Sequence, residues 1–230
     1  MPRRGRSIQG GSVYHVLNRA IGSLTLFTKP ADYEAFERVL QLACQREPLR
    51  ILSYCIMPNH WHLVVWPQTH RDDQVSEFMR WLTLTHTQRW HAHFHTAGTG
   101  PIYQGRFKSF PVQSDEHLWT VVRYLERNPK RAKLVRRAED WQWSSLYHWQ
   151  RNDDLAKTLL HDLPTSAGQR PSDWVEIVNR PQTETELAEL RRSVKRGSPF
   201  GDSKWTTHVV NRSGLDATVR PPGRPRKHEH

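Results

Sequence analysis

Cysteine is scarce in this chain, and long apolar runs are missing. The two cysteines, Cys44 and Cys55, form neither a CxxC pair nor the ligand spacing of a zinc site, which excludes a cysteine-based zinc finger. Two reduced thiols of a cytosolic protein are the simpler interpretation. No stretch approaches the ~20 apolar residues that a membrane helix needs. The basic segment 1–6 has no apolar region after it, so a signal peptide is not expected.

Acidic residues are outnumbered by basic ones. Asp and Glu total 23 against 34 Lys and Arg, which gives a formal net charge of +11. This balance is typical of a protein that binds a polyanion, with nucleic acid as the first candidate and an anionic membrane surface as the second. Apolar residues make up only 36%, but the 10 tryptophans can supply large buried areas to a core or stack on bases.

The hydrophobic pattern predicts one α+β unit over the first two thirds of the chain. Alternation indicates strands, and apolar residues at helical spacing, ended by Pro or Gly, indicate helices. The order β-α-β-β-α-β-α is that of a ferredoxin-like core with an added helix, which predicts an antiparallel sheet with helices on one face. The expected strands are 11–19, 50–57, 60–66 and 107–112, and the expected helices are 31–46, 72–95 and 115–128.

The character of the sequence changes after residue 149. We expect a first domain over residues 1–150, and a helical and basic extension over 151–230. Thr183 and Glu186 form a capping-box pattern, so a helix that runs to Lys195 is predicted. From residue 199 onward Gly, Pro and basic residues are frequent, and this segment is expected to be extended or disordered.

His60 and His62 flank Trp61 in the predicted strand 60–66. Residues two apart on a strand point to the same face, so both imidazoles can chelate one ion while Trp61 packs into a core behind them. Such a pair also arises by chance in a chain with 14 histidines, so a purely structural role stays open. A second histidine cluster, within 91–95, falls at a helix end where residues two apart diverge, and we expect it to be solvated or to face phosphates.

Tyr124 lies beside the apolar stripe of the predicted helix 115–128. Positions 118, 121, 122 and 125 form that stripe, which leaves Tyr124 at its edge and places Asn128 one turn later. A tyrosine beside an amide and several cations suits phosphoryl transfer, because cations stabilise the phenolate and the charge that develops on the phosphate. A packing role with a solvated hydroxyl is the alternative. The surrounding basic residues are Arg123, Arg127, Lys130, Arg131 and Lys133.

Several segments together resemble a known family. The run Tyr54-Cys55-Ile56-Met57-Pro58-Asn59-His60-Trp61-His62 resembles the hallmark of the HUH single-strand DNA transposases. Segments 103–109 and 124–132 are similar to later motifs of that family, and 11–19 is similar to its first strand. Within the family, the chain looks most like the REP-associated tyrosine transposases of bacteria. The resemblance covers residues 8 to 149, roughly, and its motifs occur in the family's order.

The resemblance implies a Mg²⁺- or Mn²⁺-dependent enzyme that cleaves and rejoins single-stranded DNA. His60 and His62 correspond to the family's metal ligands, and Asn128 stands where the insertion-sequence enzymes have a Gln ligand. Tyr124 corresponds to the nucleophile, which forms a covalent 5′-phosphotyrosine intermediate. The implied partner is the hairpin of repetitive extragenic palindromes (REP), with a short single-stranded guide sequence beside it. A cytoplasmic, nucleoid-associated protein with no membrane partner is expected, as a monomer rather than a dimer.

Basic residues are the candidates for further DNA contacts. Arg106 and Lys108 precede the tyrosine helix, and they either face phosphates or belong to a solvated edge strand. In the tail, Arg224 and Arg226 lie in a segment similar to an AT-hook, which binds a narrow minor groove, although a merely solubilising tail is nearly as good an interpretation. The strongest candidates for contacts that position the DNA backbone surround the tyrosine: Arg123, Arg127, Lys130 and Arg131.

Three other functions fit parts of the sequence. A DNA-binding protein of this fold without catalysis, such as a domesticated repressor, needs neither the histidine pair nor Tyr124. A replication initiator or relaxase is the second alternative, but no second tyrosine lies near Tyr124, and neither a helicase motor nor a three-histidine site is evident. A zinc hydrolase requires a third histidine or a carboxylate near His60 and His62, and none is obvious.

Overall fold

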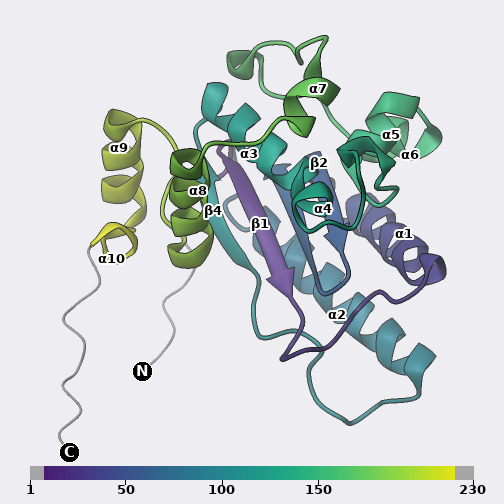
Figure 1. Ribbon diagram of the computed structural model, residues 1–230. Helices are drawn as coiled ribbons and strands as arrows, with labels where there is room; N and C mark the ends of the chain where they lie inside the picture. Colours follow the sequence, from purple (N-terminus) through teal and green to yellow (C-terminus); the bar gives the residue numbers. More distant parts are fainter. Residues whose placement is uncertain (1–7, 221–230) are drawn as a thin grey trace, which may run out of the picture.

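A four-stranded antiparallel sheet forms the centre of the protein (Figure 1). The computed structural model describes residues 8–220. The strands follow the order β2-β3-β1-β4 across the sheet, and each neighbouring pair is antiparallel. The predicted α+β, ferredoxin-like arrangement is confirmed. The strands are β1 (Val13–Arg19), β2 (Arg50–Met57), β3 (His60–Trp66) and β4 (Lys108–Val112).

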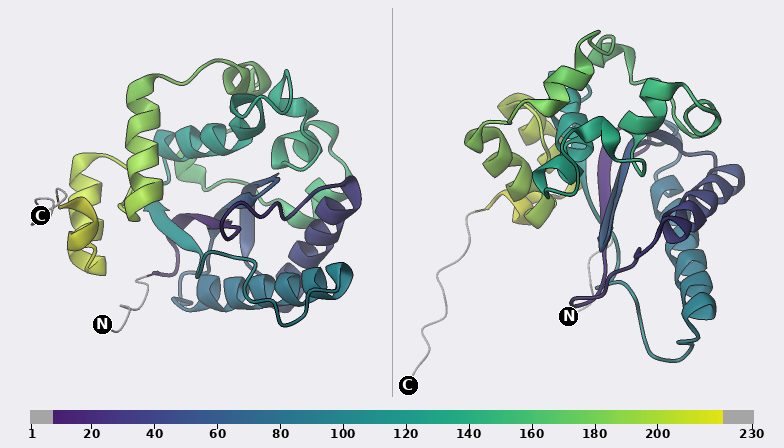
Figure 2. Two further views of the ribbon diagram at one scale, coloured as in Figure 1. Left: turned by 60° about the horizontal axis from the view of Figure 1, so that its bottom comes forward. Right: turned by 45° about the vertical axis from the view of Figure 1, so that its right-hand side comes forward.

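Helices cover both faces of this sheet. The helices α1 (Pro30–Arg46) and α2 (Gln74–Phe94) share one face, and α3 (Glu116–Glu126) lies on the other, as the left view of Figure 2 shows. The expectation of helices on one face is therefore correct for α1 and α2 and wrong for α3. The physical reason is that the strands are apolar on both faces: Leu63 is buried in the α1–α2 core, and its neighbour Val64 is buried in the α3 core.

The tyrosine helix ends earlier than predicted. α3 stops at Glu126, and after Arg127 a short helix, α4 (Asn128–Arg131), continues in the chain. Pro129 does not stop the chain from turning helically. It lies in the first turn of α4, where backbone N–H groups have no acceptor within the helix, so the missing N–H of proline costs no hydrogen bond. The N–H of Arg131 donates to the carbonyl of Arg127 at 3.0 Å, so the backbone still turns helically here.

The C-terminal extension packs over α3 and contributes to the same core. Trp174, Val178 and Leu190 belong to the apolar cluster that also holds the buried face of α3. Among residues 8–220, no helix combines the length and apolarity needed to span a bilayer. The remaining elements are η1 (Ala138–Asp140), α5 (Ser145–Arg151), α6 (Asp154–Leu159), η2 (Thr165–Ala167), α7 (Trp174–Asn179), α8 (Glu184–Arg196), α9 (Ser203–Ser213) and α10 (Asp216–Val219).

Part of the segment expected to be extended is helical. α9 and α10 form between residues 203 and 219, which corrects the expectation for this stretch. Asp202 caps the start of α9 by accepting from the N–H of Trp205, and Gly214, in the left-handed conformation, ends it. These local signals outweigh the polar composition of the segment. Arg224 and Arg226 lie outside the described residues, so their proposed minor-groove contact stays a prediction.

Candidate active site

The β2–β3 hairpin presents His60 and His62 on the face of the sheet that α3 covers. The two ring centroids are 5.0 Å apart, and the ring planes are nearly perpendicular. Trp61, between them, points to the α1–α2 face, where it is fully buried and donates its indole N–H to the Tyr103 hydroxyl at 3.0 Å. The predicted geometry is therefore found: two imidazoles project from a rigid strand that is packed from behind.

The protonation of His60 is fixed by its neighbour. The His60 Nδ1 atom lies 2.7 Å from the Asn59 side-chain oxygen, which only accepts, so Nδ1 is the donor. Burial lowers the pKa of His60 to about 4, and the charges of Arg19 and Arg131 act in the same direction. The ring is therefore neutral at physiological pH, and its Nε2 atom carries the lone pair.

His15, on β1, is a site residue that the sequence did not reveal. Its Nε2 atom lies 2.9 Å from Nδ1 of His62, and its ring stacks on Phe110 with the centroids 4.7 Å apart. Burial lowers the pKa of His15 to about 3 and holds that of His62 well below its usual value, so both rings are neutral. The signal in the sequence is a histidine inside an apolar strand, but only the strand register places it diagonally from His62.

The His15–His62 pair has two neutral tautomers. In one of them Nδ1 of His62 donates, which leaves the Nε2 lone pair of His62 facing the site. This tautomer places the other proton on Nδ1 of His15, a buried atom without a hydrogen-bond partner within residues 8–220. In the other tautomer His15 donates, and His62 carries its proton on Nε2. The first tautomer is the one that can bind a cation, and the buried N–H of His15 opposes it.

Tyr124 lies against the histidine pair in the same chain. Its ring centroid is 6.3 Å from that of His62, and only 8% of the residue is exposed. The Arg131 guanidinium covers the Tyr124 ring at 4.1 Å. One guanidinium nitrogen of Arg131, Nη1, is buried and has no hydrogen-bond partner within the described part of the chain. The tyrosine, the histidines and an unsatisfied cationic donor thus converge on one place.

The Asn128 side chain also extends toward the histidine pair, but its amide nitrogen, and not its oxygen, lies nearest to His60. The Asn128 Nδ2 atom lies 3.5 Å from Nε2 of His60, and the Asn128 oxygen accepts from Arg131 at 2.7 Å. A half-turn of the amide would bring the oxygen toward His60, but it would also set the amide N–H groups against the guanidinium donors. The proximity of Asn128 to Tyr124 and His60 is as expected, and direct ligation by its oxygen stays a prediction.

Three of the predicted DNA-contacting cations hold the extension instead of facing the tyrosine. Arg123 donates to the carbonyls of residues 180 and 181, and Arg127 donates to those of residues 178 and 179, at 2.5–3.0 Å. Lys130 donates to the Asn179 side chain at 3.0 Å. These bonds fasten the C-terminal end of α7 and the two residues after it to the tyrosine helix and α4. Contacts of the three residues with DNA stay a prediction.

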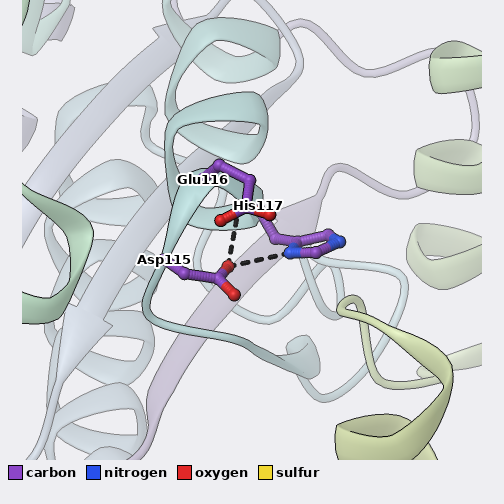
Figure 3. A group of neighbouring side chains, drawn as sticks. All are labelled: Asp115, Glu116 and His117. Carbon is purple, nitrogen blue, oxygen red and sulfur yellow. Dashed lines mark hydrogen bonds and ion pairs between the residues drawn. The ribbon is translucent and has the colours of Figure 1, made fainter.

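A separate group of possible ligands lies at the start of α3. Asp115, Glu116 and His117 bring their ligand atoms within 4.8 Å of one another. Figure 3 shows the Asp115 carboxylate turned toward His117, where it accepts from the backbone N–H at 2.9 Å and lies 2.8 Å from Nδ1. This carboxylate is the N-cap of α3, which explains the cluster as a helix start. Asp115 lies about 13.5 Å along the helix from Tyr124, so this cluster is not the predicted histidine site.

The fold and this site define a class of protein: a ferredoxin-like sheet whose paired strand histidines face a helical tyrosine, as in the HUH nucleases. The family comparison gives the same result. Residues 10–128, more than half of the chain, match the model of the family described as "Transposase IS200 like". The chain belongs to this family, and it is therefore a transposase-type, DNA-cleaving enzyme.

Two relatives agree with this assignment. A Haemophilus influenzae protein that is provisionally named a REP-associated tyrosine transposase is 23% identical over 142 residues, which are 54% of this chain and 80% of that protein. The solved structure of a REP-associated tyrosine transposase bound to a REP hairpin superposes with a TM-score of 0.55 at 20% identity, and it covers 74% of this chain and 99% of that one. The predicted family and fold are confirmed.

Proposed function

We propose that this enzyme is a metal-dependent single-strand DNA endonuclease and strand transferase that acts at REP hairpins through a 5′-phosphotyrosine on Tyr124. One observation carries the proposal: the Tyr124 ring lies 6.3 Å from the His62 ring within one chain, under the Arg131 guanidinium. The relative that was solved with a REP hairpin supports the choice of DNA.

The residues of the site fit a divalent cation. His60 and His62 are neutral, each engages Nδ1 in a hydrogen bond, and Nε2 is the atom left for ligation, which is how metal-binding histidines are usually oriented. The amide oxygen of Asn128 is the third proposed ligand. Mg²⁺ or Mn²⁺ suits a site that also takes phosphate oxygens. When bound, such a cation polarises the scissile phosphate and offsets its developing charge.

The side chains of the chain itself perform the transfer. The Tyr124 oxygen forms a bond to phosphorus while the bond to the 3′ oxygen breaks, and the phenolic proton is released as the 3′ hydroxyl takes one up. Arg131, whose guanidinium lies over the Tyr124 ring, can donate to a phosphate oxygen and thereby stabilise the transition state. Rejoining is the reverse: a 3′ hydroxyl attacks the phosphotyrosine and frees Tyr124.

The proposed enzyme works as a monomer on DNA in the cytoplasm, associated with the nucleoid. The support for a monomer is that His60, His62, Asn128 and Tyr124 meet within one chain, so no second copy is needed to complete the site. The three hydrogen-bonded cations of α3 and α4 support it as well, since they fasten the tyrosine helix to the extension of its own chain.

The test is the substitution Tyr124→Phe. Purified protein is incubated with single-stranded hairpins from repeated palindromes of its own genome, with Mn²⁺, and the products are separated on a denaturing gel. We expect a metal-dependent nick and a protein–DNA adduct with the native chain, and hairpin binding without adduct with the variant. If neither protein cuts while both bind tightly, the chain is a DNA-binding descendant of the transposases, and the catalytic roles are wrong.

A further inference from the structure

A cationic hollow lies beside the histidine pair. It measures about 410 Å³, and its wall includes Arg19, Arg106, Lys108 and Gln104. All four side chains are exposed, and none of the three cations forms an ion pair with a residue of the described chain. Arg123, Arg127 and Lys130 on the tyrosine helix and α4 differ, since backbone and amide oxygens already occupy them. The hollow therefore has positive charge that no ion pair within residues 8–220 neutralises.

The hollow adjoins the proposed catalytic centre. Arg19 is paired with His60 in the register of β1 and β3. Leu17, which also lines the hollow, is paired with His62. A phosphodiester chain that passes through the catalytic centre can therefore continue directly over these cations.

A second, apolar hollow opens next to the first. It measures about 650 Å³ and lies between α2 and segment 101–107. The two hollows share Asn18, Gly105 and Arg106. Gly105 carries no side chain, and a Cβ atom built on it would meet no atom within 4 Å apart from its chain neighbours, so there is open space at this shared position.

A leucine in the wall of the apolar hollow is exposed to solvent. Leu84, on α2, is 52% exposed, the highest value among the large apolar residues of the described chain. Glu77 is a carboxylate in the same wall, but Arg80 pairs with it at 2.6 Å, so it adds no uncompensated negative charge. An exposed apolar wall rimmed by polar groups is typical of a binding surface.

We propose that the two hollows form one nucleotide-binding subsite for the single-stranded DNA that flanks the cleaved bond. Arg19, Arg106 and Lys108 bind its phosphates, and one unstacked base enters the apolar hollow against Leu84. The inference rests on the proposed single-strand nuclease function. A cationic groove can bind the phosphate of a nucleotide, and an adjoining apolar surface can bind its base. Duplex DNA does not fit this description, because its bases stay stacked and paired.

Two measurements on the full chain, both without added metal, test the subsite. The first uses a single-stranded oligonucleotide with 2-aminopurine at each position in turn. A base that leaves the stack becomes brighter, so we expect one position to brighten on binding. Leu84→Glu should abolish the response. Leu42→Glu is the matched control, because Leu42 is a 38% exposed leucine on α1 that receives the same new charge.

The second measurement is the salt dependence of single-strand affinity. Each phosphate contact contributes about 0.7 to the slope of log affinity against log salt, so replacing Arg19, Arg106 and Lys108 with Gln should lower that slope by about 2. The control replaces three exposed cations of α1 and α2 with Gln and should leave the slope nearly unchanged. These control residues are Arg38, Arg46 and Arg89.

The outcomes separate this inference from the nuclease function. If no 2-aminopurine position brightens, or if the Arg19, Arg106 and Lys108 variant keeps the native slope, the subsite is wrong even when Tyr124 still forms its DNA adduct. If one base brightens in a Leu84-dependent way and the slope falls, the subsite is right even when no adduct forms. In that case it is the proposed catalysis that fails.

Discussion

Both faces of the sheet bury a neutral, hydrogen-bonded histidine, but the surroundings of the two differ. On the α1–α2 face, His86 packs against Phe27 and Phe36, and its Nδ1 atom lies 2.6 Å from the Tyr103 hydroxyl. On the α3 face, His62 has the same kind of single partner, His15, at 2.9 Å. Burial alone therefore does not distinguish a structural histidine from a functional one.

The difference lies in what gathers around the second ring nitrogen. His86 is enclosed by aromatic side chains that offer packing and no chemistry. His62 faces a second histidine, a tyrosine and an arginine whose Nη1 atom is unsatisfied. The comparison teaches that a functional site is recognised by several polar groups that converge and leave a position open, and not by the perturbed pKa of one group.

The largest expected effect comes from removing a proposed ligand. We expect His60→Ala to slow formation of the DNA adduct by about 10³-fold or more, because Lewis-acid stabilisation contributes several kcal/mol. Urea unfolding should show little loss of stability, because His60 lies at the end of β3 and its side chain bonds only to those of Asn59 and Asn128 among the described residues. His93→Ala, at an exposed histidine of α2, is the control and should retain native activity. Adduct formation by His60→Ala within tenfold of the native rate would remove His60 from the site.

The next effect tests whether His15 positions His62. His15→Phe keeps a ring to stack on Phe110 but removes the hydrogen-bond partner of His62. We expect the affinity for Mn²⁺, measured by titration calorimetry, to fall about 10–100-fold, as is typical for the loss of a group that orients a ligand. His15→Gln retains a polar partner and should lose less. Equal Mn²⁺ affinity of the native chain and His15→Phe would reduce His15 to a packing residue.

Most of the fold was predictable because its signals are local. Strands β2 and β3 have the predicted bounds, since an apolar run and the turn at Pro58 and Asn59 mark them. The start of α8 follows from its capping box. The placement of α3 on the opposite face was not predictable in this way, because it depends on how much apolar surface both faces of the sheet expose. α9 was not predicted, because the segment from residue 199 is rich in Gly, Pro and basic residues. The local signal for the start of a helix there is its N-cap, Asp202.

The site was predictable as far as residues close in sequence define it. Spacing alone brings His60 beside His62 and Asn128 one turn after Tyr124. The partner of His62 comes from another strand, and no spacing rule gives the register that places His15 there. The cations were the weakest part of the prediction. Position on a helix does not tell whether an arginine meets a backbone carbonyl, as Arg127 does, or the proposed nucleophile Tyr124, as Arg131 does.

A smaller effect is expected on the structural face. Tyr103→Phe removes the hydroxyl that accepts from Trp61 and bonds to His86, and it leaves both nitrogens buried without a partner. We expect a loss of about 1–3 kcal/mol in the free energy of unfolding, measured with urea. Tyr103 also lines the apolar hollow, but its hydroxyl points inward to Trp61 and His86, so the rate of adduct formation per folded molecule should not change. A variant as stable as the native chain, but slower in cleavage, would show that the two faces are not as independent as their contacts indicate.

The smallest effect concerns pH, and it separates His86 from another buried histidine, His148. Burial lowers the pKa of His86 to about 3. Burial also opposes the charge of His148, but the carboxylates of Glu37 and Asp153, at 3.3 and 2.7 Å, outweigh it and raise that pKa. The stability that depends on neutral His86 is therefore lost as the pH falls from about 6.5 toward 3, because only the unfolded chain takes up the proton there.

His148 has the opposite sign. Its stabilisation is complete below the unfolded pKa of about 6.5 and is lost as the pH rises through the higher folded pKa. We expect His148→Gln to be less stable than the native chain by about 1 kcal/mol or less at pH 6, and the difference to shrink by pH 9. Urea unfolding of both proteins at several pH values measures it. A difference that grows with pH would mean that His148 is buried neutral like His86, and that its carboxylates do not hold a proton on the ring.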